Sequence, residues 1–452
     1  MATLTQSLRR VQAHLADVLP DRLIRHACRD AGHRWRDRTL GPAVTTYLLL
    51  QQVLHGNPAV GELRRLSRLD FTDSAYCQAR QRLPLAALRQ LQRAVAGRAQ
   101  AALDDDPKAR WKGHRVWLLD GSGFSMPDSP QLREAFGQPG GQADGCGFPV
   151  AHLLLQFDAH AGYLLRAIPA PLRTHDLARV AVAHRDLRRG DVLVGDRAFC
   201  SYAHLALCRR RGLHGLFRAH QKLLIDFRRH RRFAAPGESG AAAKGLPRSR
   251  WLRRLGKHDQ LVEYHKPAQR PAWLSAEEYA ALPQALVVRE LRYTIGIPGR
   301  RTRQVTLVTT LVDARRYSAR ALAKLYGLRW QAETNIRHLK RTLGLDVVRS
   351  RTVLGVAKEL TAFVIIYNLV RRVMHTAARQ QQVEPARVSF VDAWRWLRYA
   401  RPGEAVPRLR VNPERPGRVE PRVVKRRPKQ YKHLRRPRAE LRQELLTHKH
   451  AA

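Results

Sequence analysis

Apolar residues recur at every third or fourth position through the first part of the chain, as in Leu8, Val11, Leu15 and Leu19. This spacing is typical of helices that bury one face, and it returns around residues 85–91. We therefore predict a helical N-terminal region over residues 1–110.

One short helix inside this region can be delimited by its ends. The segment from Phe71 to Pro84 predicts a short helix that Thr72 or Asp73 can cap and that Pro84 ends. The polar residues 80–82 come late on this helix, where they can reach phosphates or base edges. Two interpretations remain open, a helix-turn-helix and an ordinary helical bundle with a charged face.

The pattern changes near Trp111, where short apolar segments replace the helical period. The segments of strand length are residues 116–119, 149–168 and 191–195, the second with a turn at 158–162. A helical stretch follows Thr174, which we take as its start together with the acidic residue at 176. Strands alternating with helices predict a mixed α/β sheet, and we assign residues 111–215 to the first part of a catalytic core.

The helical period fades again between residues 216 and 300, where Phe, Val, Leu and Tyr alternate with Pro, Gly and basic residues. We predict a β-rich insertion there, closed by a strand pair at 286–295 and 304–311. Residues 301–375 return to the core and are helical from Ser318 onward. Residues 376–452 form a basic, Pro-rich C-terminal region of the kind that is often flexible.

Charge limits the class of partner. The chain has 83 Lys and Arg against 37 Asp and Glu, a formal net charge of +46. Such an excess favours a polyanion, because phosphate contacts release condensed counterions. The alternative is a solvated basic surface shaped by genome composition. We therefore predict nucleic acid as the partner, and we assign DNA binding to the helical N-terminal region.

The remaining composition argues against membranes, zinc sites and disulfides. The five cysteines form no C-x-x-C pair and are predicted to be core residues in a reducing cytosol. The N-terminus lacks the apolar core of a signal peptide. The longest apolar stretch, residues 360–370, is too short to span a bilayer. We expect a cytoplasmic bacterial protein, associated with the nucleoid when bound to DNA, and no membrane partner.

Three carboxylates stand out as candidate chemistry. Asp120 and Asp196 each end an apolar strand beside a glycine, and Glu333 lies on a predicted helix. Such a set of hard oxygen ligands suits Mg²⁺ or Mn²⁺, and two ions together suit phosphodiester chemistry. Turn roles are common for Asp at strand ends, so each Asp alone remains ambiguous.

The helix that carries Glu333 has a mixed stripe. Tyr326, Arg329, Glu333 and Lys340 fall on one side of an uninterrupted helix. The alternative is a surface ion pair, since Arg329 and Glu333 are four residues apart.

The segment from Tyr326 to Lys340 fits the pattern Y-x2-R-x3-E-x6-K. In this pattern the chain resembles DNA transposases of the insertion-sequence-four (IS-four) family. Asp120-Gly-Ser and Gly195-Asp196-Arg197 are similar to the first and second acidic motifs of that family. The resemblance runs from about residue 70 to the C-terminus.

This resemblance implies a ribonuclease-H-like core with a β-rich insertion, and cut-and-paste transposition by a DDE enzyme. Asp120, Asp196 and Glu333 would be both the catalytic residues and the ligands of two divalent ions, Mg²⁺ or Mn²⁺. The residues expected to contact DNA are Tyr326, Arg329, Lys340, Arg197, Trp251 and Trp273, with Phe227 as a further aromatic candidate. The two Trp residues would stack on a flipped base, although a core role is the alternative for each.

The implied partners are the terminal inverted repeats of the protein's own element and target DNA. Bringing two ends together implies a homodimer. Two rival functions remain open at this stage, namely a metal-dependent nuclease without strand transfer and a non-catalytic, domesticated DNA-binding protein.

Overall fold

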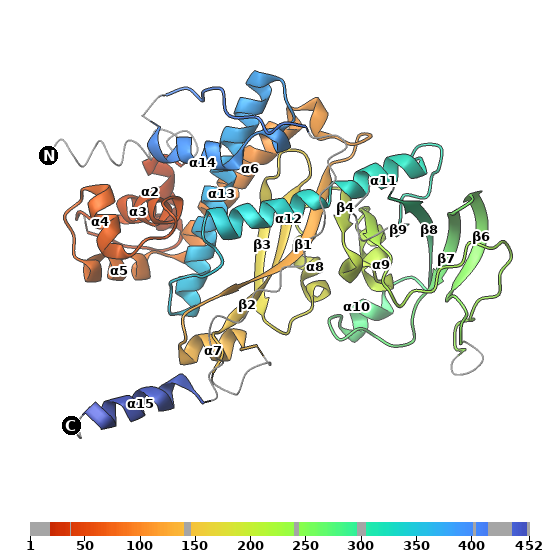
Figure 1. The fold of residues 1–452 in the computed structure, drawn as a ribbon, viewed down its shortest axis with the longest axis horizontal. Coiled ribbons are helices and arrows are strands. Elements are labelled where there is room, and N and C mark those ends of the chain that lie inside the picture. The colour runs from red at the N-terminus through yellow and green to blue at the C-terminus, as the bar shows by residue number, and fades with distance from the viewer. Residues whose placement is uncertain are drawn as a thin grey trace.

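The computed structural model describes residues 19–36, 38–139, 146–238, 244–295, 304–400, 404–414 and 436–449. Its centre is one sheet of nine strands in the order β3-β2-β1-β4-β5-β9-β8-β7-β6. The N-terminal helices lie at one end of the molecule and the β6–β7 pair lies at the other (Figure 1). The predicted mixed α/β class is confirmed.

The first five strands form one side of the sheet, in the order β3-β2-β1-β4-β5. β1 (Val116–Ser125) pairs antiparallel with β2 (Val150–Asp158), which pairs antiparallel with β3 (Leu164–Pro171). On its other side, β1 pairs parallel with β4 (Val192–Gly195), and β4 pairs parallel with β5 (His214–Arg218). The carboxyl ends of three parallel strands therefore point the same way.

The β-rich insertion is not a separate module, because its strands extend the core sheet. β9 (Gln304–Thr309) pairs antiparallel with β5, and β8 (Ala285–Thr294), β7 (Asp259–His265) and β6 (Ser249–Gly256) follow in turn. The boundary predicted at residue 216 falls inside β5, because the short apolar strand is continuous across it.

The helices surround this sheet. The N-terminal region contains α2 (Asp21–Asp30), α3 (Pro42–Leu54), α4 (Val60–Ser67), α5 (Asp73–Arg82) and α6 (Leu85–Asp104). The core and insertion contain α7 (Pro130–Phe136), α8 (Val180–Ala183), α9 (Tyr202–Arg210) and α10 (Ala276–Ala280). Toward the C-terminus follow α11 (Ala319–Gly327), α12 (Trp330–Arg337), α13 (Val353–Gln381), α14 (Phe390–Tyr399) and α15 (Arg438–Lys449). Short 3₁₀ turns are η1 (Pro107–Ala109), η2 (Asp176–Arg179), η3 (Arg197–Phe199) and η6 (Pro385–Arg387), and η5 (His338–Thr342) is π-helical.

Alternation along β1 divides the core into two layers. Leu118 belongs to the apolar cluster that includes α13 and the N-terminal helices, whereas Trp117 and Leu119 belong to the cluster beneath α8 and α9. Side chains on a strand point to opposite faces in turn, so Asp120 shares the face of Leu118. Ala332 of α12 is buried in that same cluster.

α13 is the central helix of the fold. It is long and apolar enough to cross a membrane by length and composition, in contrast to the shorter apolar stretch expected at 360–370. However, 78% of its most apolar window is buried inside the protein, which is the environment of a core helix. The helix also continues to Gln381, beyond the boundary predicted at residue 375.

Several local predictions are confirmed. The Thr72 hydroxyl accepts a hydrogen bond from the Ala75 amide and caps α5, which ends before Pro84. The strand pairs predicted at 149–168 and at 286–295 with 304–311 are β2–β3 and β8–β9. The prediction of a start at Thr174 is wrong, because the His175 ring accepts the Leu177 amide and caps η2 instead.

Two longer predictions need correction. β1 does not end at Asp120 but runs to Ser125, because β2 continues to pair with it after β4 has ended. The helical segment from Ser318 is broken into α11, α12 and a π-helical turn before α13. Residues 1–18 of the predicted helical N-terminal region and much of the basic C-terminal tail lie outside the described residues.

Candidate active site

Sheet register brings the two aspartates to neighbouring positions. Leu118 of β1 is paired with Val194 of β4 in parallel register. Asp120 and Asp196 each come two residues later, at the carboxyl end of the parallel pairing. One oxygen of each is held by backbone, since Asp120 Oδ1 accepts the Gly121 amide at 2.9 Å and Asp196 Oδ1 accepts the Ala198 amide at 2.8 Å. The turn role that the sequence left open for Asp120 and Asp196 is therefore present as well.

The third carboxylate comes from α12, which packs against β1. Glu333 lies in the first turn of this helix, and its neighbour Ala332 is fully buried in the core. The Glu333 side chain is 39% exposed. Glu333 therefore lies on the same face of the sheet as Asp120, as a common site requires.

Arg329 lies between two of these acids. Its Nη2 is 2.7 Å from Glu333 Oε1, and its Nη1 is 3.8 Å from Asp120 Oδ2. Its side chain is 14% exposed. The surface ion pair that the sequence left open is therefore present, but it is largely enclosed and includes a second carboxylate.

The pKa of Asp120 reflects its burial and the negative charges near it. Burial raises its pKa to about 6, and the charges of Asp196 and Glu333 act in the same direction. The guanidinium of Arg329 and the Gly121 amide oppose this rise. The three carboxylates thus interact electrostatically although they come from distant parts of the chain.

This pKa gives a prediction about stability. A carboxyl whose pKa is raised on folding contributes stability below its unfolded value, and this contribution is lost as the pH rises through about 6. In metal-free buffer at pH 8, Asp120→Asn should therefore stabilise the protein by on the order of 2 kcal/mol. Thermal melts in EDTA should show a gain of a few degrees at pH 8 that disappears near pH 4.

The exposed Asp313, which caps the turn after β9, provides the control for these melts. Asp313→Asn should leave the melting temperature unchanged at both pH values. An Asp120→Asn variant that is no more stable than the wild type at pH 8 would show that the charge of Asp120 carries no folding cost.

Tyr326 and Lys340 occupy different surroundings. Tyr326 is 7% exposed at the end of α11, and burial raises the pKa of its phenol to about 12, so the hydroxyl stays protonated at neutral pH. Lys340 lies in the π-helical turn, where its Nζ is 3.0 Å from Asp346 Oδ1. The single stripe expected for these residues is interrupted, because the wider turn changes the angular spacing after Arg337.

The remaining residues predicted to contact DNA have partners other than the three acids. Arg197 is exposed and donates a hydrogen bond to Gln221 at 2.8 Å. Trp251 of β6 is half-buried, with its ring 4.5 Å from that of His230. Trp273 packs against the apolar cluster beneath α8 and α9. Phe227 lies beneath the guanidinium of Arg292, at 5.0 Å.

Sequence reasoning missed three side chains beside the site. Asp176, treated as the start of a helix, lies against Gly121, where an added Cβ would be 2.8 Å from its carboxylate oxygens. His152 of β2 has its Nε2 3.3 Å from Asp176 Oδ1. Trp330 is 53% exposed next to Arg329, whose guanidinium lies 5.3 Å from the ring centre. The signal for Trp330 was its place inside the Y-x2-R-x3-E pattern, whereas the pairing of Asp176 with His152 depends on the sheet.

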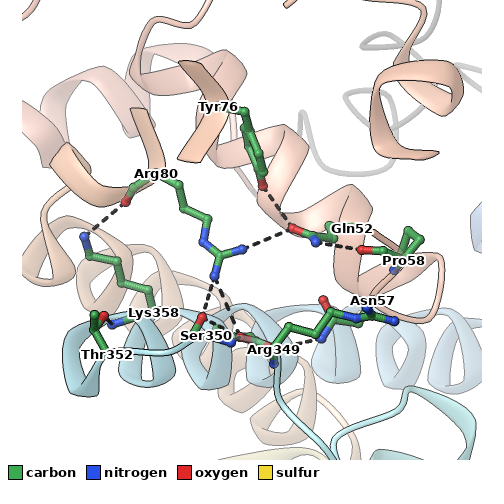
Figure 2. Close-up of polar contacts among 11 residues, drawn as sticks. Gln52, Asn57, Pro58, Tyr76, Arg80, Arg349, Ser350, Thr352 and Lys358 are labelled. Atoms are coloured by element: carbon green, nitrogen blue, oxygen red, sulfur yellow. Dashed lines mark hydrogen bonds and ion pairs between the residues drawn. The ribbon is translucent and has the colours of Figure 1, made fainter. Parts of the chain in front are cut away.

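A basic cavity of about 580 Å³ lies between the N-terminal helices and the start of α13 (Figure 2). Four cations line it, namely Arg80, Arg349, Arg351 and Lys358. Arg80, which was expected on an open face, instead donates hydrogen bonds to Gln52 and Ser350 (Figure 2). The Lys358 ammonium donates to the Gln81 carbonyl at 2.7 Å.

Buried Glu359 forms hydrogen bonds that connect the segments around this cavity. Its oxygens accept hydrogen bonds from the amides of Arg349 and Ser350, both at 2.9 Å, and from the Asn57 amide group at 2.6 Å. Arg80 is 3.8 Å from the same carboxylate. The side chains of Arg349 and Arg351 remain exposed next to the N-terminus of α13, which Thr352 caps. The cavity therefore presents positive charge and a helix N-terminus on one surface.

The carboxylate group fits divalent metal ions. Asp120, Asp196 and Glu333 offer hard oxygen ligands, which Mg²⁺ and Mn²⁺ prefer. The repulsion that raises the pKa of Asp120 is the kind that a bound cation relieves.

Comparison with known proteins agrees with this site. A family model described as the transposase DDE domain matches residues 111–369, more than half of the chain. The transposase InsG for insertion sequence element IS4 of Escherichia coli (strain K12) is 25% identical over 455 residues, covering 94% of each chain. The putative transposase InsZ of the same strain is 26% identical over 235 residues, covering 49% of this chain and 76% of its own.

Among solved structures, a piggyBac transposase synaptic complex with hairpin DNA aligns with a TM-score of 0.45 and 10% identity, covering 87% of this chain and 79% of the other. The matched domain contains all three acids and the entire Y-x2-R-x3-E-x6-K segment. Transposases with a DDE domain act on DNA and use divalent metal ions. The chain belongs to the DDE transposases of the IS4 family and is an enzyme of that type.

Proposed function

We propose that this transposase excises and reinserts its own insertion element by a cut-and-paste route, with Asp120, Asp196 and Glu333 as its catalytic residues. The observation that supports this proposal most is the geometry of the three acids: Asp120 and Asp196 follow paired positions on neighbouring parallel strands, and Arg329 of the site helix contacts both Asp120 and Glu333. When bound, two Mg²⁺ or Mn²⁺ ions supply activation of a water or 3′-hydroxyl and stabilisation of the leaving oxygen.

The protein's own residues prepare the site for this chemistry. The backbone amides of Gly121 and Ala198 fix the two aspartates, so that their carboxylates need little reordering on binding. Arg329 balances the charge of Asp120 and Glu333 and can hold a phosphate of the DNA end. The protonated hydroxyl of Tyr326 is suited to donate a hydrogen bond to the same strand.

The basic cavity is the proposed contact for the backbone of the terminal repeat. It joins the N-terminal helices to the catalytic core, and the exposed Arg349 and Arg351 suit bidentate contact with phosphates. The other proposed contacts are Lys340, Arg197, Trp251 and Trp273, with target DNA following after excision. A homodimer would bring two element ends together, in the cytoplasm and on the nucleoid.

Binding to terminal-repeat DNA should depend steeply on salt. The slope of log K against log salt should become shallower by about 1 for each arginine removed, hence by about 2 in an Arg349→Ala, Arg351→Ala double variant. Fluorescence anisotropy with a labelled repeat between low and moderate salt measures this slope. Arg228→Ala is the matched control, because Asp226 already neutralises this exposed arginine at 2.7 Å. A double variant with the wild-type slope would place the DNA elsewhere.

The rival functions differ in the DNA products that they form. A nuclease without strand transfer would cut the element end and leave it unjoined, whereas a transposase joins the 3′-hydroxyl to target DNA. A non-catalytic, domesticated DNA-binding protein would do neither. Incubation of end-carrying DNA with a target plasmid and Mg²⁺ separates these functions, and we expect joined product.

A further inference from the structure

A second group of metal-binding side chains lies away from the three acids. Asp106 precedes η1, His160 lies in the turn between β2 and β3, and His375 belongs to α13. Asp106 Oδ2 is 3.0 Å from His160 Nε2 and 3.2 Å from His375 Nε2. These three elements are far apart in sequence, so the contact joins the end of the N-terminal region to the core.

Solvent can reach this group. The three residues lie on the wall of a cavity of about 800 Å³ that is also lined by Lys324 and Gln331. The side chains of Asp106 and His160 are 11% and 17% exposed, and that of His375 is 3% exposed. An ion can therefore enter and keep coordination positions that open toward the cavity.

Neighbouring groups hold both imidazoles in place. The Tyr163 hydroxyl is 3.3 Å from His375 Nδ1, so the Nε2 atom of that ring faces Asp106. The amide of His160 donates to Asp158 Oδ1 at 3.1 Å, which fixes the turn. The two rings meet edge to face, with centroids 5.9 Å apart, so they approach the carboxylate from different directions. Metal-binding histidines are commonly oriented by partners of this kind.

We propose that Asp106, His160 and His375 bind one divalent transition-metal ion of the Zn²⁺ class, separately from the Mg²⁺ or Mn²⁺ of the catalytic acids. Imidazole ligands favour Zn²⁺, Co²⁺ and Ni²⁺ over Mg²⁺. Tetrahedral Zn²⁺ with bonds of about 2.0–2.1 Å sets ligand atoms about 3.3–3.4 Å apart. The two contacts with Asp106 therefore need to widen by only a few tenths of an ångström, and the three ligand atoms already lie within 4.8 Å of one another.

The bound ion connects the residue before η1, the β2–β3 turn and α13. Without it, the Nε2–H groups donate hydrogen bonds to the Asp106 carboxylate. With it, both Nε2 atoms lose their proton and offer a lone pair, and the His375 Nδ1–H donates to Tyr163. Since the folded chain brings these ligands together and an unfolded chain does not, binding raises stability.

The test is Zn²⁺ titration of tag-free, full-length protein against a chromophoric chelator, in buffer containing Mg²⁺. We expect one Zn²⁺ per chain, a higher melting temperature with Zn²⁺, and tetrahedral Co²⁺ absorption bands when Co²⁺ replaces it. His160→Ala and Asp106→Asn should lose all three signals. Circular dichroism verifies that each variant is folded, and loss of the signals in either folded variant places the ion at this site.

Two controls separate this site from others. His26→Ala removes an exposed imidazole that has a single carboxylate partner, Asp30 at 3.3 Å, and should keep the signals. Asp120→Asn should also keep them, so that failure at the catalytic acids is distinguishable from failure here. Absence of Zn²⁺ binding by the wild type, or equal binding by His160→Ala, would overturn the proposal and leave a hydrogen-bonded cluster.

Discussion

Single-turnover cleavage of DNA that ends in the element's terminal repeat should slow by at least about a thousandfold in Asp120→Asn, Asp196→Asn and Glu333→Gln. Each substitution keeps the size of the side chain and removes one negative charge from the group of three carboxylates. Loss of an oxygen ligand weakens the hold on the metal ions, and charge that develops on the leaving oxygen then lacks stabilisation. Rapid-quench assays in Mg²⁺ measure the effect.

DNA binding provides the internal control for this result. The three variants should bind the repeat about as tightly as the wild type, because the phosphate contacts we propose lie mainly on basic residues. Asp313→Asn, at an exposed strand end, should cleave at the wild-type rate. Normal cleavage by any of the three variants would remove that residue from the catalytic group.

Replacing Arg329 should produce the second large effect. Both Arg329→Ala and Arg329→Lys should slow cleavage and joining by on the order of a hundredfold, since a misplacement of about 1 Å costs that much in rate. Lysine keeps the charge but loses the planar fork that spans Asp120 and Glu333. Single-turnover rates beside a thermal melt in Mg²⁺ distinguish positioning from stability.

Arg329 is largely enclosed between Asp120 and Glu333, so Arg329→Ala should also lower the melting temperature, whereas Arg329→Lys keeps the charge and should change it little. Arg320→Ala, an exposed arginine on α11, is the matched control and should keep the wild-type rate. If Arg329→Lys cleaved normally, the arginine would serve only as a charged partner of Glu333.

Local signals made much of the fold predictable. Short apolar runs that end at Asp120 and Asp196 marked two core strands, because a buried strand needs apolar side chains on both faces. The Thr72 cap and Pro84 defined α5. The motif around Glu333 identified the site helix, since its spacing restricts which side chains share a face.

What remained unpredicted depends on contacts between distant segments. The strand expected to end at Asp120 continues to Ser125, because β2 pairs with it there. The insertion joins the main sheet through β9 and β5, a pairing that no local pattern encodes. The π-helical turn moves Lys340 toward Asp346, whereas helical spacing assumes an unbroken helix. Asp176 reaches Gly121 only because η2 folds back over the end of β1.

Anomalous diffraction from Mn²⁺ in crystals of the protein bound to its terminal-repeat DNA tests the central claim most directly. We predict two peaks about 3.5–4 Å apart, within bonding distance of carboxylate oxygens from Asp120, Asp196 and Glu333. The same experiment with Asp120→Asn should lose at least one peak. Peaks that lie elsewhere, or that touch none of these three side chains, would contradict the account.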